Sequence, residues 1–303
     1  MFNKIPALTC AAALMMGAAS LSAEEAKVTN AQFIEDVGAS ERINFSGKLR
    51  MLSQRIPAAA CYSHASVETE ASAKMLEAAT AEFDQILYAL EFGDETLGIK
   101  GEEKDRRALT DLKELHAHWD YLHPEIADII KTGGTDEEVQ HIALESHEIL
   151  TYAKDLVSAL VAEHSDPTAL LQADALTIDI AGRQRMLAQR ISKNVCLIQS
   201  GFDVEVAQKE LNGARSIYDA SARALRHGMP EAGITATDNA EILSKLDDVL
   251  ALWEDLQAIL DSVKAGEMIG KDQEARVYNA MNSLTGQMNT VVGLYNVESK
   301  LGL

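Results

Sequence analysis

Proline and aromatic residues are scarce in this sequence. There are only 5 prolines in 303 residues, and aromatic residues make up 5% of the chain. Glycine is also limited, with 18 residues, whereas alanine, leucine and glutamate are common. Proline and glycine interrupt helices, and the common residues favour them. The composition therefore indicates an all-α fold.

Basic residues and long apolar runs are limited as well. The chain has 27 Lys and Arg against 47 Asp and Glu, a formal net charge of −20. Nucleic acids and anionic membrane surfaces are polyanionic, so this charge argues against either as a partner. Beyond the N-terminal region no stretch is apolar enough to cross a bilayer, so we expect no membrane insertion of the mature chain.

The N-terminal region has the pattern of an export signal. Lys4 precedes an apolar run from Ile5 to about Leu21, and small residues up to Ala23 are followed by Glu24. The run is too short for a stable membrane span. We therefore expect a signal peptide over residues 1–23, cleaved near Ala23, and a periplasmic mature protein.

The rest of the sequence repeats itself with an offset of 135 residues. Residues 43–56 read INFSGKLRMLSQRI and residues 178–191 read IDIAGRQRMLAQRI, with eight of fourteen positions identical. The same offset pairs Cys61 with Cys196, Phe83-Asp84 with Tyr218-Asp219, Leu90 with Leu225, and Gly98-Ile99 with Gly233-Ile234. The repeat predicts two domains, copy one over residues 24–166 and copy two over residues 167–303. Pro167 marks the boundary because proline ends a helix.

Each copy is expected to form four helices. Apolar residues alternate steps of three and four, as in Leu112, Leu115, Trp119, Leu122, Ile126 and Ile129. This spacing specifies near-parallel packing of neighbouring helices. The expected helices cover roughly 30–64, 67–92, 103–131 and 136–164, then 168–200, 203–227, 237–265 and 271–300. Short connections make neighbours antiparallel, so the predicted fold is two tandem antiparallel four-helix bundles.

The first helix of each copy carries two stripes about 200° apart. One stripe of copy one is apolar and suits the bundle core: Phe45, Leu49, Leu52, Ile56 and Ala59. The other, which we call the outer stripe, holds Ile43, Gly47, Arg50, Gln54, Pro57 and Cys61 in copy one, and Ile178, Gly182, Arg185, Gln189, Ser192 and Cys196 in copy two. The two copies share five of six residues on the outer stripe but only two of five on the core stripe.

The outer stripes predict an interface that contains a binding site. Gly47 and Gly182 permit close approach of a helix or ligand. Arg50 and Arg185 present planar donor groups suited to a carboxylate, nitrate or phosphate. If the two outer stripes face each other, the arginines converge, and an anion between them relieves their repulsion. A salt bridge from each arginine to a neighbouring acid is the alternative.

The motif repeated in residues 43–56 and 178–191 resembles the signature of the PilJ-type domain. This domain is the N-terminal module of type IV pili methyl-accepting chemotaxis transducers. The motif is also similar to the periplasmic P-box of nitrate/nitrite sensor kinases of the NarX type. The pattern IN-x-[SA]-G-x-x-RML-[SA]-QR carries the resemblance, with Asp179 in place of the Asn44 type in copy two. The later FD…L…GD pattern appears as Phe83-Asp84, Leu90 and Gly93-Asp94.

The resemblance implies a periplasmic helix bundle that senses a small ligand. The nitrate-binding arginine of the sensor kinases corresponds to Arg50 and Arg185. Departures from those kinases occur at Lys48-Leu49 and at Leu52-Ser53-Gln54. The transducers and kinases continue through a membrane into a signalling region, and this chain is expected to pass its signal to another protein. The candidate ligand-binding residues are Arg50, Arg185, Gly47, Gly182, Asn44, Gln54 and Gln189.

Two further features left alternatives open. Cys61 and Cys196 each follow an outer-stripe arginine by eleven residues, so they can form a disulfide if the stripes meet; buried unpaired cysteines are the alternative. Seven of the eight histidines lie in copy one, and Glu138-x-x-His141 has the spacing of di-metal bundles. Such sites need a second motif of this kind, so structural histidines are the simpler interpretation.

No nucleophile–base motif, phosphate-binding loop or CxxC pair is present, so the sequence gives no basis for an enzyme or a cofactor. The expected function is a sensory protein that binds a small anion such as nitrate or nitrite and signals through a membrane receptor or transducer. The alternatives are a protein-interaction module without a small ligand and a metal-binding bundle. The sequence leaves open a homodimer, and side-by-side or end-to-end packing of the copies.

Overall fold

The computed structural model describes residues 39–164 and 172–301, so the predicted signal peptide lies outside the described residues. In that part of the chain every regular element is helical. The helices are α1 (Ala39–His64), α2 (Thr69–Phe92), α3 (Arg106–Thr132), α4 (Asp136–His164), α5 (Gln172–Ser200), α6 (Val204–His227), α7 (Ala240–Asp255), α8 (Gln257–Lys264) and α9 (Lys271–Leu301), with short 3-10 helices η1 (Glu95–Leu97) and η2 (Pro230–Ala232). This confirms the all-α prediction.

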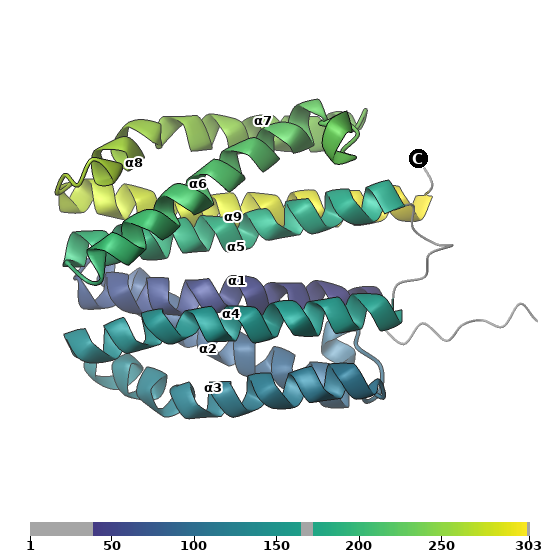
Figure 1. Ribbon diagram of the computed structural model, residues 1–303, viewed down its shortest axis with the longest axis horizontal. Coiled ribbons are helices and arrows are strands. Elements are labelled where there is room, and N and C mark those ends of the chain that lie inside the picture. The colour runs from purple at the N-terminus through teal and green to yellow at the C-terminus, as the bar shows by residue number, and fades with distance from the viewer. Residues whose placement is uncertain (1–38, 165–171, 302–303) are drawn as a thin grey trace, which may run out of the picture. The chain divides into compact units, whose positions relative to one another are not determined.

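The helices form two bundles that lie side by side (Figure 1). In copy one α1 packs against α2 and α4, and in copy two α5 packs against α6 and α9. The two first helices, α1 and α5, pack against each other in the middle of the molecule. Cys61 of α1 is bonded to Cys196 of α5, its equivalent in the repeat, and nearer the start of both helices Arg50 lies 3.4 Å from Asp179. The contacts advance in the same direction along α1 and α5, so the two helices run parallel.

One predicted helix is interrupted. The sequence predicts a single helix over 237–265, but the structure has α7 and α8 on either side of Leu256. The Leu256 amide donates to the Trp253 carbonyl at 3.2 Å, which tightens the turn, and the Gln257 side chain donates to the same carbonyl at 2.8 Å. Competition from this side-chain amide for a backbone acceptor explains a break that the heptad spacing does not predict.

A tryptophan–aspartate pair recurs in both bundles. The Trp119 indole nitrogen donates to Asp84 at 2.7 Å, and the Trp253 indole nitrogen donates to Asp219 at 3.0 Å. Each tryptophan also packs on the aromatic residue before its aspartate, with ring centroids 4.0 Å apart for Phe83 and 4.5 Å for Tyr218. A buried indole N–H needs an acceptor. The pairs therefore fix the second helix of each copy on the third.

The connection after the second helix also repeats. Asp94 and Ile99 form an isolated antiparallel bridge around η1, and Met229 and Ile234 form the same bridge around η2. The turn requires a left-handed residue, supplied by Gly98 at φ +74° in copy one and by its equivalent glycine in copy two. None of the described helices is both long and apolar enough to cross a membrane.

Candidate functional site

The outer stripes of α1 and α5 are buried where the two bundles meet. Gly47, Gly182 and Arg185 are all buried, and Arg185 retains only 3% of its accessible surface. The Arg185 guanidinium donates to the Gly182 carbonyl at 3.3 Å and to the side-chain oxygen of Asn289 in α9 at 2.7 Å. The arginine therefore lies along α5 and is held by neutral acceptors.

The two glycines make room for the guanidinium groups. A Cβ at Gly47 would lie 3.5 Å from Arg50 Nη2 and 3.8 Å from Arg185 Nη2. A Cβ at Gly182 would lie 3.5 Å from the same Arg185 nitrogen. Both guanidinium groups thus approach one point on the α1 backbone, although their repulsion opposes this arrangement.

The two arginines differ in their acidic neighbours. Arg50 lies 3.4 Å from Asp179 of α5, which also pairs with Arg183 at 2.5 Å. Among the described residues no carboxylate oxygen lies within ion-pair distance of Arg185. The salt-bridge alternative therefore describes Arg50 but not Arg185.

Burial and neighbouring cations make the protonated form of Arg50 and Arg185 less favourable and lower the pKa of both side chains. Burial is the main cause that lowers the pKa of Arg185 to about 10, and Arg50 and Arg55 lower it further against an opposing effect of Glu82. Burial also lowers the pKa of Arg50, despite the charge of Asp179. A protein with a large negative net charge therefore has a local excess of positive charge at this interface.

Gln54 and Gln189, two further residues of the predicted site, form hydrogen bonds with residues other than the two arginines. The Gln54 amide donates to Ser53 Oγ at 3.2 Å and to the Ser146 carbonyl of α4 at 3.3 Å. The Gln189 amide donates to Asn282 of α9 at 3.1 Å and to Thr285 Oγ1 at 2.7 Å. Each glutamine therefore ties a first helix to the last helix of its own bundle. Asn44 is partly buried in α1.

A disulfide joins the two first helices. Cys61 and Cys196 are bonded, with their Cα atoms 6.1 Å apart. The sequence left open whether these cysteines pair. Because the bond connects equivalent residues of α1 and α5, it fixes the register of the interface that also contains Arg50 and Arg185.

The copy-one histidines are paired with carboxylates. A carboxylate oxygen lies within 3.3 Å of a ring nitrogen in seven pairs: His64 and Asp136, His116 and Glu91, His118 and Glu145, His123 and Asp84, His141 and Glu125, His147 and Glu210, and His164 and Glu103. Glu138 instead caps α4, where its carboxylate accepts from the Thr135 amide at 2.7 Å. Among residues 39–164 and 172–301 no group of three or more His, Cys, Asp or Glu side chains is placed to hold a metal ion.

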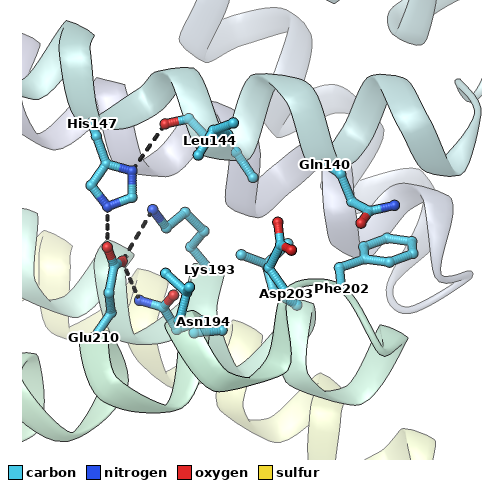
Figure 2. A pocket seen from close by; sticks show the side chains of 12 residues that line it. Gln140, Leu144, His147, Lys193, Asn194, Phe202, Asp203 and Glu210 are labelled. Carbon is cyan, nitrogen blue, oxygen red and sulfur yellow. Dashed lines mark hydrogen bonds and ion pairs between the residues drawn. The ribbon is translucent and has the colours of Figure 1, made fainter.

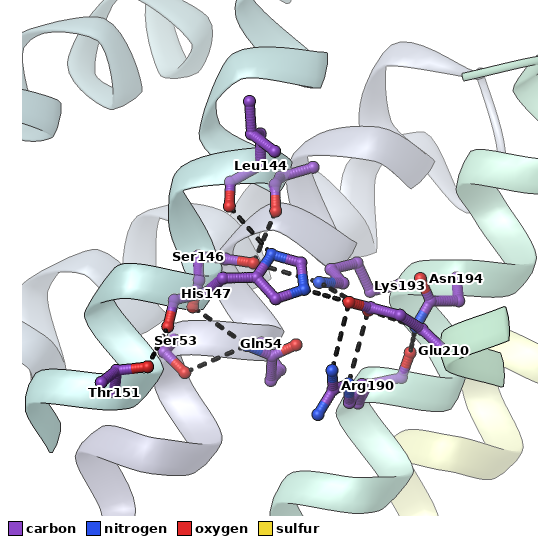
Figure 3. Close-up of polar contacts among 11 residues, drawn as sticks. Ser53, Gln54, Leu144, Ser146, His147, Thr151, Arg190, Lys193, Asn194 and Glu210 are labelled. Carbon is purple, nitrogen blue, oxygen red and sulfur yellow. Dashed lines mark hydrogen bonds and ion pairs between the residues drawn. The ribbon is translucent and has the colours of Figure 1, made fainter. Parts of the chain in front are cut away.

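Sequence reasoning missed a buried ionic cluster at the junction of the two copies (Figure 3). Lys193 of α5 is 1% exposed, and its ammonium group lies 3.1 Å from Ser146 Oγ of α4 and 3.5 Å from Glu210 of α6. Glu210 also pairs with Arg190 at 3.1 Å and with His147 of α4. The cluster therefore connects α4 of copy one to α5 and α6 of copy two.

The charges of this cluster alter one another's titration. Burial lowers the pKa of Lys193 to about 8, although Glu210 opposes the effect. Burial alone would raise the pKa of Glu210, but hydrogen bonding to His147 and the charges of Lys193 and Arg190 hold it well below its usual range. A broken repeat is the signal that identifies the cluster, because Ala58 and Met75 stand at the positions equivalent to Lys193 and Glu210.

Comparisons with known proteins match both copies. The family model PilJ, described as "Type IV pili methyl-accepting chemotaxis transducer N-term", matches residues 35–144 and again residues 168–281. The "Protein PilJ" of Pseudomonas aeruginosa is 23% identical over 231 residues, which cover 73% of this chain and 31% of that protein. The chain therefore matches less than a third of that relative's length. Because the family model matches most of the sequence in two copies, the chain belongs to the PilJ family of type IV pili methyl-accepting chemotaxis transducer N-terminal domains.

Proposed function

We propose that this chain is a periplasmic sensory module that binds a small anion between α1 and α5 and passes the signal to another protein. Membership of a family named for the N-terminal part of chemotaxis transducers supports the sensory role. The export pattern of the N-terminal region supports the location. The match covers 31% of the relative from Pseudomonas aeruginosa. The protein that receives the signal from this chain is therefore itself part of the proposal.

The observation that carries the anion site is the environment of Arg185. Its guanidinium is almost fully buried and has neutral acceptors in place of a carboxylate. A buried charge without a counter-charge costs several kcal/mol in general, and pairing with an opposite charge offsets that cost. A bound anion beside Gly47 would neutralise Arg185 and reduce its repulsion with Arg50.

The geometry of a guanidinium group favours a small, planar anion. The two glycines carry no side chains beside the guanidinium groups, where a Cβ would stand at ordinary contact distance. Nitrate, nitrite or a short carboxylate accepts from a guanidinium in its own plane. The overall negative charge acts against anion binding, but beyond about 8 Å physiological salt screens it, whereas the arginines act at contact distance.

Asp179 pairs with Arg50 when no anion is bound. Its carboxylate lies beside Arg50, where a bound anion would also be attracted. An anion that enters must therefore compete with Asp179 for Arg50, while Arg185 offers donors without an acidic competitor. Release of Asp179 would change the contact between α1 and α5, and this change is the proposed signal.

Isothermal titration calorimetry of the exported chain with nitrate, nitrite, formate and acetate tests this function. Arg185→Ala should weaken binding of the preferred anion at least about tenfold, because charged hydrogen bonds are worth roughly 1.5–3 kcal/mol. Arg223→Ala is the matched control, since Arg223 is an exposed arginine of α6 paired with Asp219. Absence of binding by all four anions, or equal affinity of the two variants, would refute the site.

A further inference from the structure

A hollow lies where copy one meets copy two, outside the arginine site (Figure 2). It is lined by α4 on one side and by α5, α6 and the turn between them on the other. Its apolar lining consists of Ala143, Leu144, Leu197, Phe202, Val206 and Ala207. The cavity volume is about 30 Å³, so the hollow is a shallow depression that opens to solvent. We call this hollow the junction groove.

The polar side of the junction groove is already satisfied internally. Lys193, Asn194 and Glu210 line it, but Lys193 donates to Ser146, and Asn194 donates to Glu210 at 3.2 Å. The His147 ring likewise bonds to Glu210 and to the Leu144 carbonyl. The surface that an occupant would meet is therefore apolar, and a polar or charged head group would find few free partners.

Large aliphatic side chains stand exposed at the mouth of the groove. Leu144 of α4 is 57% exposed and Val206 of α6 is 54% exposed. An apolar hollow with exposed aliphatic residues at its rim is typical of a surface that receives an apolar side chain from a partner. Two helices form this rim, so a partner helix can lie along it with an apolar anchor residue against Leu144, Val206 and the mouth of the hollow.

Charge selects the kind of partner. Glu137 and Glu148 lie seven residues before and four residues after Leu144, on the same side of α4, and both are exposed. Asp203 of the α5–α6 turn lines the groove itself and is exposed. A second copy of this chain, also at −20, would be repelled, whereas a basic segment would be attracted.

We infer that the junction groove docks a basic amphipathic helix of the signalling partner through an apolar anchor residue. The inference rests on the proposed function, because it assigns the surface from which the signal leaves. Its walls belong to different copies, so movement of α1 against α5 would change the spacing of α4 and α6. Such a groove reports the relative position of the two bundles.

A model peptide tests the docking directly. The probe is a fluorescent, amidated helix of about 18 lysine and alanine residues with two leucines one turn apart. Fluorescence anisotropy with the exported chain should give saturable binding. Val206→Asp should weaken it at least about tenfold, as expected for loss of an interface anchor. Ile217→Asp is the matched control, because Ile217 is a 57% exposed residue of α6 outside the groove.

The outcomes separate the groove from the anion site. Equal peptide affinity for the two variants, or no saturable binding, overturns the groove even if anions bind. A peptide with glutamate in place of lysine that binds as well overturns the basic partner. Concentration-dependent dimers that Val206→Asp alone abolishes identify a second copy as the occupant and also overturn it. Loss of anion binding in Arg185→Ala with saturable peptide binding of unchanged affinity supports both the anion site and a separate groove.

Discussion

The ammonium group of Lys193 lies 3.5 Å from the carboxylate of Glu210, and the repeat has no equivalent pair in copy one. Ala58 and Met75 stand at the corresponding positions of α1 and α2. The two bundles therefore differ at these two positions: copy one has apolar residues there, and copy two has buried charges. The charged version contacts Ser146 of the opposite bundle, so the asymmetry lies at the junction of the copies.

Removal of Glu210 alone should be costly. Glu210→Met leaves Lys193 buried without its carboxylate, and breaking a buried pair in this way typically costs about 3–5 kcal/mol. Glu210→Met combined with Lys193→Ala places the copy-one residues in copy two and removes both charges. We expect the double variant to recover at least about 1 kcal/mol of that loss, measured as the free energy of unfolding in urea.

Glu205→Met is the control for this pair, since Glu205 is an exposed residue five positions earlier on α6. It should leave the free energy of unfolding within about 0.5 kcal/mol of the parent value. A double variant that loses as much stability as the sum of its single variants would show that Lys193 and Glu210 do not act as a pair.

Gly47→Ala should separate folding from anion binding. The added Cβ would lie at ordinary contact distance from both guanidinium groups, so the fold can accept it. Alanine is favoured over glycine inside a helix by about 1 kcal/mol, so stability should be equal or higher. The methyl group would nevertheless fill the space proposed for the anion. Calorimetry should therefore show weaker anion binding with an unchanged or raised melting temperature.

The control for the glycine experiment is Gly213→Ala. Gly213 lies within α6, and a Cβ there would meet no atom within 4 Å. The substitution should raise the melting temperature and leave anion affinity unchanged. If Gly47→Ala binds the anion as tightly as Gly213→Ala does, the ligand does not occupy the space beside Arg50 and Arg185.

The helices could be predicted from the sequence because local signals specify them. The heptad spacing of α3 depends on residues within a few turns, and the observed α3 and α4 begin within three residues of the predicted positions. The repeat also identified the outer stripe, since five of its six positions agree between copies. On a single first helix the outer stripe lies about 200° from the core stripe. This angle already predicts that the outer stripe faces away from the core stripe, towards a second helix.

The polar contacts of the first helices were harder to predict from the sequence. Arg50 selects Asp179, whereas Arg185 selects Asn289, and this choice depends on which side chains the neighbouring helices present. Gln54 and Gln189 share the outer stripe with the arginines, yet long flexible side chains let them reach their own bundles. Lys193 contacts Ser146, which is 47 residues earlier in the chain, and no local pattern specifies such a pair.

Reduction of the disulfide should loosen the interface of the first helices. The bond between Cys61 and Cys196 closes a sequence separation of 135 residues, and loops of this size typically gain about 2–5 kcal/mol of stability from the link. Cys61→Ser with Cys196→Ser should therefore lower the urea midpoint. Treatment with dithiothreitol should reproduce the loss in the parent protein and have no effect on the double variant.

Mass spectrometry checks the bond itself. After denaturation without reductant, alkylation of the purified protein should leave Cys61 and Cys196 unmodified, and a peptide pair linked through them should appear. Modification of both cysteines under these conditions would show that the bond is not formed. An equal urea midpoint before and after reduction would show that the bond contributes little to the interface.

His64 should make stability depend on pH. Its Nδ1 lies 3.1 Å from the Gly133 carbonyl and its Nε2 lies 2.7 Å from Asp136, so both nitrogens face acceptors and the charged ring suits them best. Burial lowers the pKa of His64, but the hydrogen bonds to Asp136 and Gly133 outweigh it, and the pKa is raised. The resulting stability is present in full below the unfolded value of about 6.5 and is lost as pH rises through the folded pKa.

His64→Gln should therefore destabilise the protein most at acidic pH. The difference in free energy of unfolding between parent and variant should be largest at about pH 5.5 and should shrink towards about pH 8. Because the pair is partly exposed to solvent, its size should stay below about 1 kcal/mol. Asp136→Asn should likewise reduce the change in the free energy of unfolding between about pH 5.5 and pH 8. In the His64→Gln background, Asp136→Asn should not reduce this pH dependence any further. A difference that stays constant from about pH 5.5 to pH 8 would mean that His64 packs between α1 and α4 without carrying a charge.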